Sequence, residues 1–208
     1  MNAQQLLIDG PDDADTTLVL AHGAGAPMDH PFMSAIAAGV AAGGIRVVRF
    51  EFEYMAARRE GRRPGPDREP KTRARWAEVI DTLGGPQNLV IGGKSMGGRI
   101  ASLIADEHEV RGLVCLGYPF HPIGKPEKLR TAHLEGIKTP TLIVQGERDS
   151  MGTTADVEGY ALSEAIEVEW MPDGDHSFKP RKRSGHTEEE NLDAVVAAVV
   201  RFVNGLGG

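Results

Sequence analysis

A serine set among glycines constrains this chain of 208 residues more than any other feature. Residues 92–98 read Gly-Gly-Lys-Ser-Met-Gly-Gly, so Gly93 and Gly97 stand two positions either side of Ser95. An apolar run at 88–91 precedes the segment and a helical pattern follows it. A sharp turn from a strand into a helix strains the residue at the turn and exposes its side chain. Bulky neighbours would collide there, so the spacing predicts Ser95 as an exposed nucleophile.

The same residues resemble the end of a phosphate-binding P-loop. That motif requires a further glycine five positions before Gly93, and Asn88 occupies the position. The P-loop interpretation therefore fails, and the strand–serine–helix interpretation stands.

Short apolar runs alternate with helical patterns along the chain. Several runs are apolar throughout, which is typical of strands covered on both faces in a parallel sheet. We therefore expect an α/β fold with a doubly wound, mostly parallel sheet flanked by helices. No linker or repeat divides the chain, so residues 1–208 are expected to form a single domain. The expected strands are residues 17–21, 46–52, 88–91, 112–116, 141–144 and 166–170.

Helical signals fill the intervals between these runs. Thr72 is an expected N-cap, with Gly84 as the stop signal of the same helix. Thr187 and Glu190 match a capping box ahead of the last helix. The other expected helices cover residues 32–42, 98–106 and 154–162, and the last one ends at Gly205.

A serine hydroxyl needs a base to remove its proton. Where the serine follows a strand in this way, the acid and then the histidine come later in the chain. Asp149 lies just beyond the expected strand 141–144, with Glu147 as the competing acid, and His176 follows the last expected strand. Ser95, Asp149 and His176 are therefore the predicted catalytic residues, with Asp149 holding the imidazole tautomer.

When such a serine attacks a carbonyl group, negative charge develops on the carbonyl oxygen, and hydrogen-bond donors must stabilise it. The backbone N–H of Met96, directly after the serine, is one predicted donor. The small residues of the loop 22–30 allow close backbone approach, and Ala24 N–H is the first choice there, with Gly25 second. His22 is expected to organise this loop.

The stretch before the strand at 141–144 leaves little room for a lid. It can hold a turn and one short helix around residues 126–134, so an open site with a minimal lid is expected. Candidate substrate-pocket walls, each with core packing as the alternative, are Met28, Tyr118, Phe120 and His121.

Bulk properties exclude several classes of partner. The net charge of −7 argues against binding to nucleic acid, because the polyanion is repelled. The start of the chain does not read as a signal peptide, and no apolar run approaches the roughly 20 residues of a membrane span. The one cysteine, Cys115, lies in an apolar run and is expected to be a buried thiol in a reducing compartment. We therefore expect a cytoplasmic protein without metal, cofactor, nucleic acid or membrane; the oligomeric state stays open.

One segment is biased in composition. Residues 58–71 contain five arginines and three prolines. A solvated loop is one interpretation, and a rim that faces an anion or a partner is the other. The sequence leaves both open.

Several motifs together resemble the KANL3/Tex30-like family of α/β-hydrolases, which is distantly similar to dienelactone hydrolases. They are residues 22–25, 92–99, 116–119 with 121–122, 145–146 with 149, and 174–176. The resemblance implies an α/β-hydrolase fold and carries the triad over to Ser95, Asp149 and His176. Dienelactone hydrolases use a cysteine at the position of Ser95, so the resemblance does not extend to their chemistry.

These observations predict a metal-independent serine hydrolase of the esterase type that acts on small carboxylic esters. A non-catalytic scaffold or binding module with the same fold is one alternative. Peptide or thioester hydrolysis on the same triad is the other.

Overall fold

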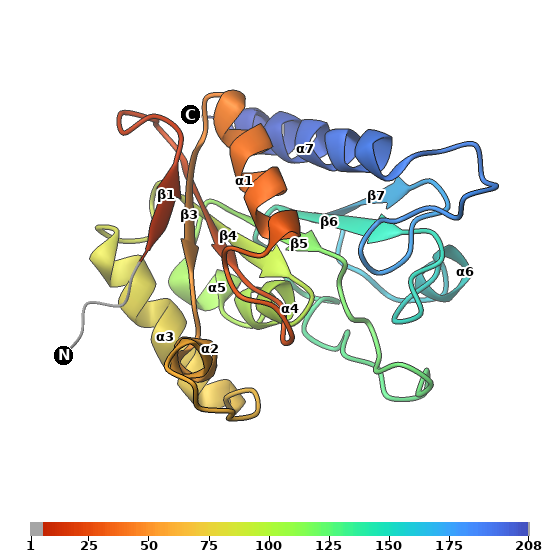
Figure 1. Cartoon of the computed structure of the whole chain (residues 1–208), viewed down its shortest axis with the longest axis horizontal. Helices are drawn as coiled ribbons and strands as arrows, with labels where there is room; N and C mark the ends of the chain where they lie inside the picture. Colours follow the sequence, from red (N-terminus) through yellow and green to blue (C-terminus); the bar gives the residue numbers. More distant parts are fainter. Residues whose placement is uncertain (1–5, 208) are drawn as a thin grey trace.

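The computed structural model describes residues 6–207, which form one seven-stranded sheet (Figure 1). The strand order is β1-β3-β2-β4-β5-β6-β7, and only the β1–β3 pair is antiparallel. This confirms the expected doubly wound, mostly parallel sheet. The strands are β1 (Leu7–Asp9), β2 (Thr17–Ala21), β3 (Arg46–Phe50), β4 (Leu89–Lys94), β5 (Gly112–Leu116), β6 (Thr141–Gly146) and β7 (Ile166–Met171).

Helices cover both faces of the sheet. Figure 1 shows α1 and α7 together on one side, with α2, α3, α4 and α5 on the other. None of the helices formed by residues 6–207 combines the length and apolarity needed to cross a bilayer. The helices are α1 (Pro31–Ala42), α2 (Glu53–Arg59), α3 (Glu69–Thr82), α4 (Met96–Ser102), α5 (Ala105–His108), α6 (Thr154–Val157) and α7 (Glu188–Gly205).

The central strands are apolar throughout because each face has its own core. Along β4, Leu89 and Ile91 pack in the cluster that contains α3 and α4 residues, whereas Val90 packs in the cluster of α1 and α7. Successive side chains of a strand point to opposite faces. A strand between two helical layers must therefore be apolar at every position.

The last helix forms as predicted. Thr187 Oγ1 accepts from the Glu190 N–H at 3.1 Å, and Glu190 Oε2 accepts from the Thr187 N–H at 2.8 Å. These reciprocal bonds satisfy amides that a helix start leaves unpaired. The valine stripe of the helix is buried against the sheet at Val195, Val199 and Val203.

Helix boundaries differ from expectation in three places. Thr72 is not an N-cap, because α3 begins at Glu69 and Thr72 Oγ1 donates to the Glu69 carbonyl from inside the helix. The expected helix 98–106 is two helices, α4 and α5, separated at residues 103–104. The expected helix 154–162 ends at Val157.

The thin cover formed by the connection between β5 and β6 lacks the short helix expected there. Residues 117–140, which join β5 to β6, contain turns but no helix, so the short helix expected at 126–134 is wrong. Local hydrogen bonds close successive turns instead, such as that from Lys128 N–H to the Lys125 carbonyl at 3.0 Å. The expected minimal lid is confirmed.

Candidate active site

Ser95 occupies the turn between β4 and α4. Its backbone has φ 52° and ψ −115°, in the left-handed half of the map that residues with a Cβ rarely enter. The Ser95 N–H donates to the Leu116 carbonyl at 2.9 Å, which fixes the turn to the end of β5. The side chain is partly exposed. Strand, strained serine and helix therefore follow one another as the motif predicts.

Backbone packing explains the glycines around this serine. A Cβ added at Gly93 would lie 2.2 Å from the Ala21 carbonyl oxygen, and one at Gly97 would lie 2.4 Å from the same atom. A Cβ at Gly92 would lie 1.9 Å from the Val114 carbonyl oxygen on β5. The turn thus packs against two neighbouring strands at distances that leave no space for a side chain.

An acid and a histidine meet beside this turn. Asp149 follows β6, His176 follows β7, and Asp149 Oδ2 lies 2.6 Å from Nδ1 of His176. Asp149 is fully buried, and it also accepts from Gln145 Nε2 and the Met151 N–H, each at 2.9 Å. Burial with three donors fixes the carboxylate as an acceptor for the imidazole N–H.

Glu147, the competing acid, points elsewhere. It is exposed, and its Oε2 accepts from the Asp173 N–H at 2.7 Å. The structure thus brings Asp149, and not Glu147, to His176.

Ser95 and His176 both lie against the end of β5. A Cβ at Gly117 would be 3.4 Å from Cε1 of His176, and the preceding residue, Leu116, bonds to Ser95. Within residues 6–207, Ser95 Oγ makes no hydrogen bond to His176. Nucleophile–base hydrogen bonds are often long without substrate and shorten in the Michaelis complex.

Gln145 is a site residue that the sequence analysis did not assign. Besides Asp149, its Nε2 contacts the carbonyl oxygens of Tyr118 at 3.2 Å and Gly152 at 3.1 Å, and its Oε1 accepts from the Tyr118 N–H at 2.7 Å. One buried amide therefore joins the loops after β5 and β6. Its signal in the sequence is a polar residue that directly follows the apolar run of β6.

Asn191 on α7 was also missed. Its Nδ2 donates to the Phe178 carbonyl at 2.7 Å and to the Pro172 carbonyl at 3.0 Å. Phe178 is itself fully buried. Both ends of the short segment that carries His176 are thereby held against the last helix.

The loop 22–30 is held by His22, as expected. Its Nε2 lies 3.2 Å from the Phe52 N–H and must accept, so the ring proton resides on Nδ1, which donates to the Gly23 carbonyl at 2.7 Å. Burial lowers the pKa of His22, which favours this neutral form. The carbonyl and N–H of a trans peptide point in opposite directions, so the bond to Gly23 also orients the Ala24 N–H.

This loop lies beside the nucleophile. A Cβ at Gly23 would be 3.8 Å from the Ser95 Cβ. Tyr54 Oη donates to the Ala24 carbonyl at 3.0 Å and restrains the next peptide. Met96 is the first residue of α4, so its N–H has no intrahelical acceptor. Both predicted oxyanion donors therefore belong to backbone that borders Ser95.

Replacing His22 with phenylalanine is expected to lower kcat for an ester about 10- to 100-fold with little change in KM, because the Ala24 peptide loses its restraint. Steady-state hydrolysis of p-nitrophenyl acetate measures the effect. His108→Phe, on α5, is the matched control and should keep the wild-type rate. A His22→Phe protein with wild-type kcat would contradict the assignment.

The four predicted pocket walls are interior residues in this structure. Tyr118 and Phe120 pack with tilted rings whose centroids are 4.9 Å apart, and Tyr118 Oη donates to the Arg130 carbonyl at 2.9 Å. Packing therefore accounts for these side chains, and their contact with substrate stays a prediction. All four are buried: Met28, Tyr118, Phe120 and His121.

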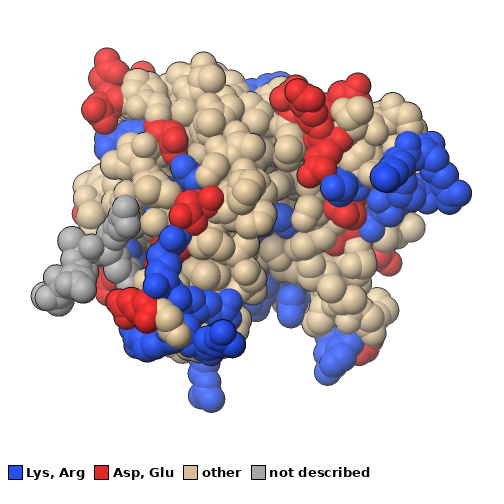
Figure 2. Space-filling view, in the orientation of Figure 1, with Lys and Arg blue, Asp and Glu red and all other residues tan. Residues whose placement is uncertain are grey.

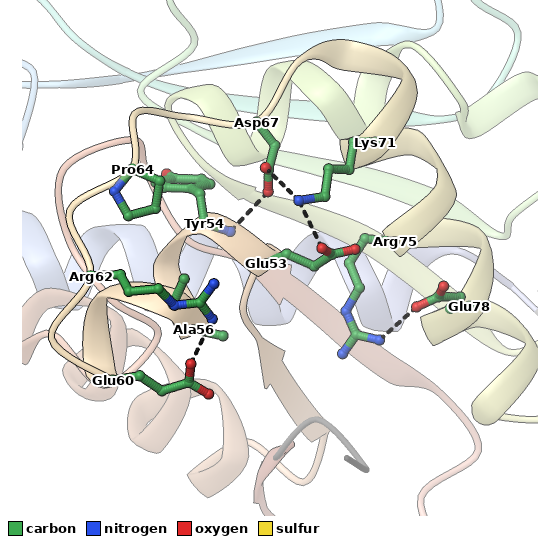
Figure 3. A pocket seen from close by; sticks show the side chains of 11 residues that line it. Glu53, Tyr54, Ala56, Glu60, Arg62, Pro64, Asp67, Lys71, Arg75 and Glu78 are labelled. Carbon is green, nitrogen blue, oxygen red and sulfur yellow. Dashed lines mark hydrogen bonds and ion pairs between the residues drawn. The ribbon is translucent and has the colours of Figure 1, made fainter. Parts of the chain in front are cut away.

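A separate hollow of about 500 Å³ lies between α2 and α3, at the arginine- and proline-rich segment (Figure 3). Its charged side chains pair with one another: Lys71 Nζ lies 2.7 Å from Glu53 and 2.9 Å from Asp67. Figure 2 shows basic side chains gathered over the α2 end of the molecule. Neither Ser95 nor His176 lines the hollow, and the role of residues 58–71 stays open.

The sheet order and the strained serine turn together define the α/β-hydrolase fold. The family model described as "Alpha/beta hydrolase domain" matches residues 14–204, and the chain belongs to this family.

Comparisons with individual proteins agree with this assignment. A putative protein-lysine deacylase, ABHD14B of Rattus norvegicus, is 33% identical over 118 residues. That match spans 56% of this chain and only 53% of the relative, about half its length.

Solved structures are similar over nearly the whole chain. A serine hydrolase without a lid from Xanthomonas campestris superposes with a TM-score of 0.71 at 19% identity, covering 96% of this chain and 87% of the other. Est1E of Butyrivibrio proteoclasticus gives 0.70 at 14% identity, covering 98% and 97%. A dienelactone hydrolase from Anabaena variabilis gives 0.69 at 21%, covering 95% and 89%. At these identities the likeness concerns the fold alone.

Proposed function

We propose that the protein is a serine hydrolase of the esterase type that cleaves small carboxylic esters with Ser95, His176 and Asp149. The observation that carries the proposal is the 2.6 Å contact between Asp149 Oδ2 and His176 Nδ1, beside a serine held at φ 52°. A buried acid, a partly exposed imidazole and a strained serine are the parts that nucleophilic acyl transfer requires.

Each residue has a distinct role in this reaction. Ser95 Oγ attacks the ester carbonyl carbon while His176 Nε2 takes its proton, and Asp149 stabilises the imidazolium that forms. The N–H groups of Met96 and Ala24 hold the oxyanion. His176 then protonates the departing alkoxide. Water, deprotonated by the same imidazole, hydrolyses the acyl-enzyme and restores Ser95.

Finer assignments belong to the same proposal. The motif around Ser95, with Lys94 before it and Arg99 after it, supports membership of the KANL3/Tex30-like group. The lone, fully buried thiol of Cys115 supports a cytoplasmic location.

The partial likeness to the rat protein favours one second candidate. Its name describes removal of acyl groups from protein lysine, and a serine triad can cleave amides by the same steps. A panel containing p-nitrophenyl acetate, a thioester and an acetyl-lysine peptide separates the two. Esters as the preferred substrates support the main proposal, and a higher kcat/KM for the peptide supports the second.

Covalent labelling with a fluorophosphonate tests the proposed nucleophile. The intact protein should gain one adduct by mass spectrometry, and Ser95→Ala should gain none, because only the activated serine reacts. Ser184→Ala, at a partly exposed loop serine, is the matched control and should label like the wild type. An unreactive wild-type protein, or equal labelling of Ser95→Ala, would contradict the proposal and favour a non-catalytic module.

A further inference from the structure

Lys94, the residue before the nucleophile, is a buried lysine that the mechanism does not use. Only 9% of the residue is exposed, at the last position of β4. Its Nζ donates to the backbone carbonyl of His176 at 2.7 Å. Ser95 is the proposed nucleophile, and its neighbour Lys94 contacts His176, the residue that supplies the proposed base.

The surroundings of the Lys94 ammonium both favour and oppose its positive charge. Nζ lies 5.8 Å from the ring centroid of Phe32 and 5.9 Å from that of Phe178, distances at which aromatic faces attract cations. Burial lowers the pKa of Lys94 to about 8, although the carboxylates of Asp149 and Asp175 oppose the shift. An apolar side chain would fill this space without the cost of removing an ammonium from water.

The end of β5 leaves room for this contact. Gly117 has φ 67°, and a Cβ there would lie 2.8 Å from Lys94 Nζ and 3.0 Å from the His176 carbonyl oxygen. Any side chain at this position would compete with the hydrogen bond. Three segments that are far apart in the sequence thus meet at one ammonium group.

We propose that Lys94 is a positioning residue, whose ammonium ties the His176 backbone to the serine turn and holds the imidazole in register with Ser95. The role rests on the proposed function. The hydrogen bond that His176 Nδ1 donates to Asp149 fixes the ring, and the bond that Lys94 donates fixes the main chain that carries the ring. Together they leave the base little freedom to move away from the nucleophile.

Replacing Lys94 with methionine keeps the length of the side chain and removes the donor. The expected result is a fall in kcat of about 10- to 100-fold, since small misplacement of a catalytic group is costly, with KM within about threefold. The low-field proton NMR resonance of the short Nδ1–H···Oδ2 bond should also be lost or broadened. Lys138 is an exposed lysine just before the start of β6, whereas Lys94 lies at the end of β4. Lys138→Met is therefore the matched control and should change neither kcat nor the resonance.

Retention of wild-type kcat or of the unchanged resonance in folded Lys94→Met overturns the proposal. Circular dichroism verifies folding. If Lys94→Met does not fold, Lys94→Gln, whose shorter amide cannot reach the His176 carbonyl, is measured in the same way. If the wild-type protein fails to react with fluorophosphonate, the esterase proposal falls, and the resonance alone then decides the role of Lys94.

Discussion

Replacing Asp149 with asparagine is expected to lower kcat for ester hydrolysis about 10⁴-fold while the protein stays folded. The carboxylate accepts three hydrogen bonds and donates none. An asparagine NH2 at the Oδ2 position would face the donors of Gln145 and His176, and at the Oδ1 position it would face the Met151 N–H. In either orientation the negative charge that stabilises the imidazolium is lost. Single-turnover acylation with p-nitrophenyl acetate measures the loss directly.

Glu147→Gln is the matched control for this substitution. Glu147 lies two residues before Asp149 but is exposed and contacts Asp173. We expect its kcat to stay within about twofold of wild type, because the lost bond lies outside the reacting groups. A large loss in Glu147→Gln with little loss in Asp149→Asn would reverse the assignment of the acid.

The second large effect concerns stability. Gly92→Ala would place a Cβ 1.9 Å from the Val114 carbonyl oxygen. Residue 92 lies on β4 and Val114 on the adjacent strand β5, so neither atom can move without its strand. Relief requires β4 and β5 to separate locally, which breaks their hydrogen bonds. We expect the free energy of unfolding to fall by about 3 kcal/mol or more, and Tm by about 6 to 12 °C.

Urea and thermal unfolding followed by circular dichroism measure this loss. Gly136→Ala is the control, because a Cβ at that exposed glycine meets nothing within 4 Å. Its free energy of unfolding should stay within about 0.5 kcal/mol of wild type. A mild effect of Gly92→Ala would mean that the two strands can move apart at low cost.

The fold and the meeting of Asp149 with His176 were predictable because their signals in the sequence are local. Strand β4 has a continuous apolar pattern, and Gly93 and Gly97 mark the turn around Ser95 by their spacing. The order of Ser95, Asp149 and His176 then follows from strands whose ends meet at one edge of the sheet. The structure brings Asp149 to His176, and the roles of all three in catalysis stay predictions.

The supporting residues were not predictable, because nothing near them in the sequence marks their contacts. Gln145, Asn191 and Lys94 each bond to backbone atoms of other segments, up to 82 positions away for Lys94 and His176. The same reason applies to β1, whose three residues are too few for a pattern and pair only through β3.

Helix boundaries failed for a different physical reason. Thr72 is a good capping residue, but Pro70 already suits the first turn, so the helix begins earlier and the threonine hydroxyl turns to a carbonyl. Where two start signals of similar strength lie close together, the sequence does not determine at which residue the helix begins.

The thin cover formed by residues 117–140 has a consequence for engineering. Its outer part is exposed, including Ile123 and Leu129, and surface loops accept added residues at small entropic cost, about 0.6 kcal/mol for each doubling of length. Its link to the acid runs through Tyr118, at the inner end, where Gln145 contacts the main chain. If the proposed function holds, a helical cap inserted near Gly124 is therefore expected to change which acyl groups reach Ser95, while Gln145 keeps its contacts with Asp149 and Tyr118.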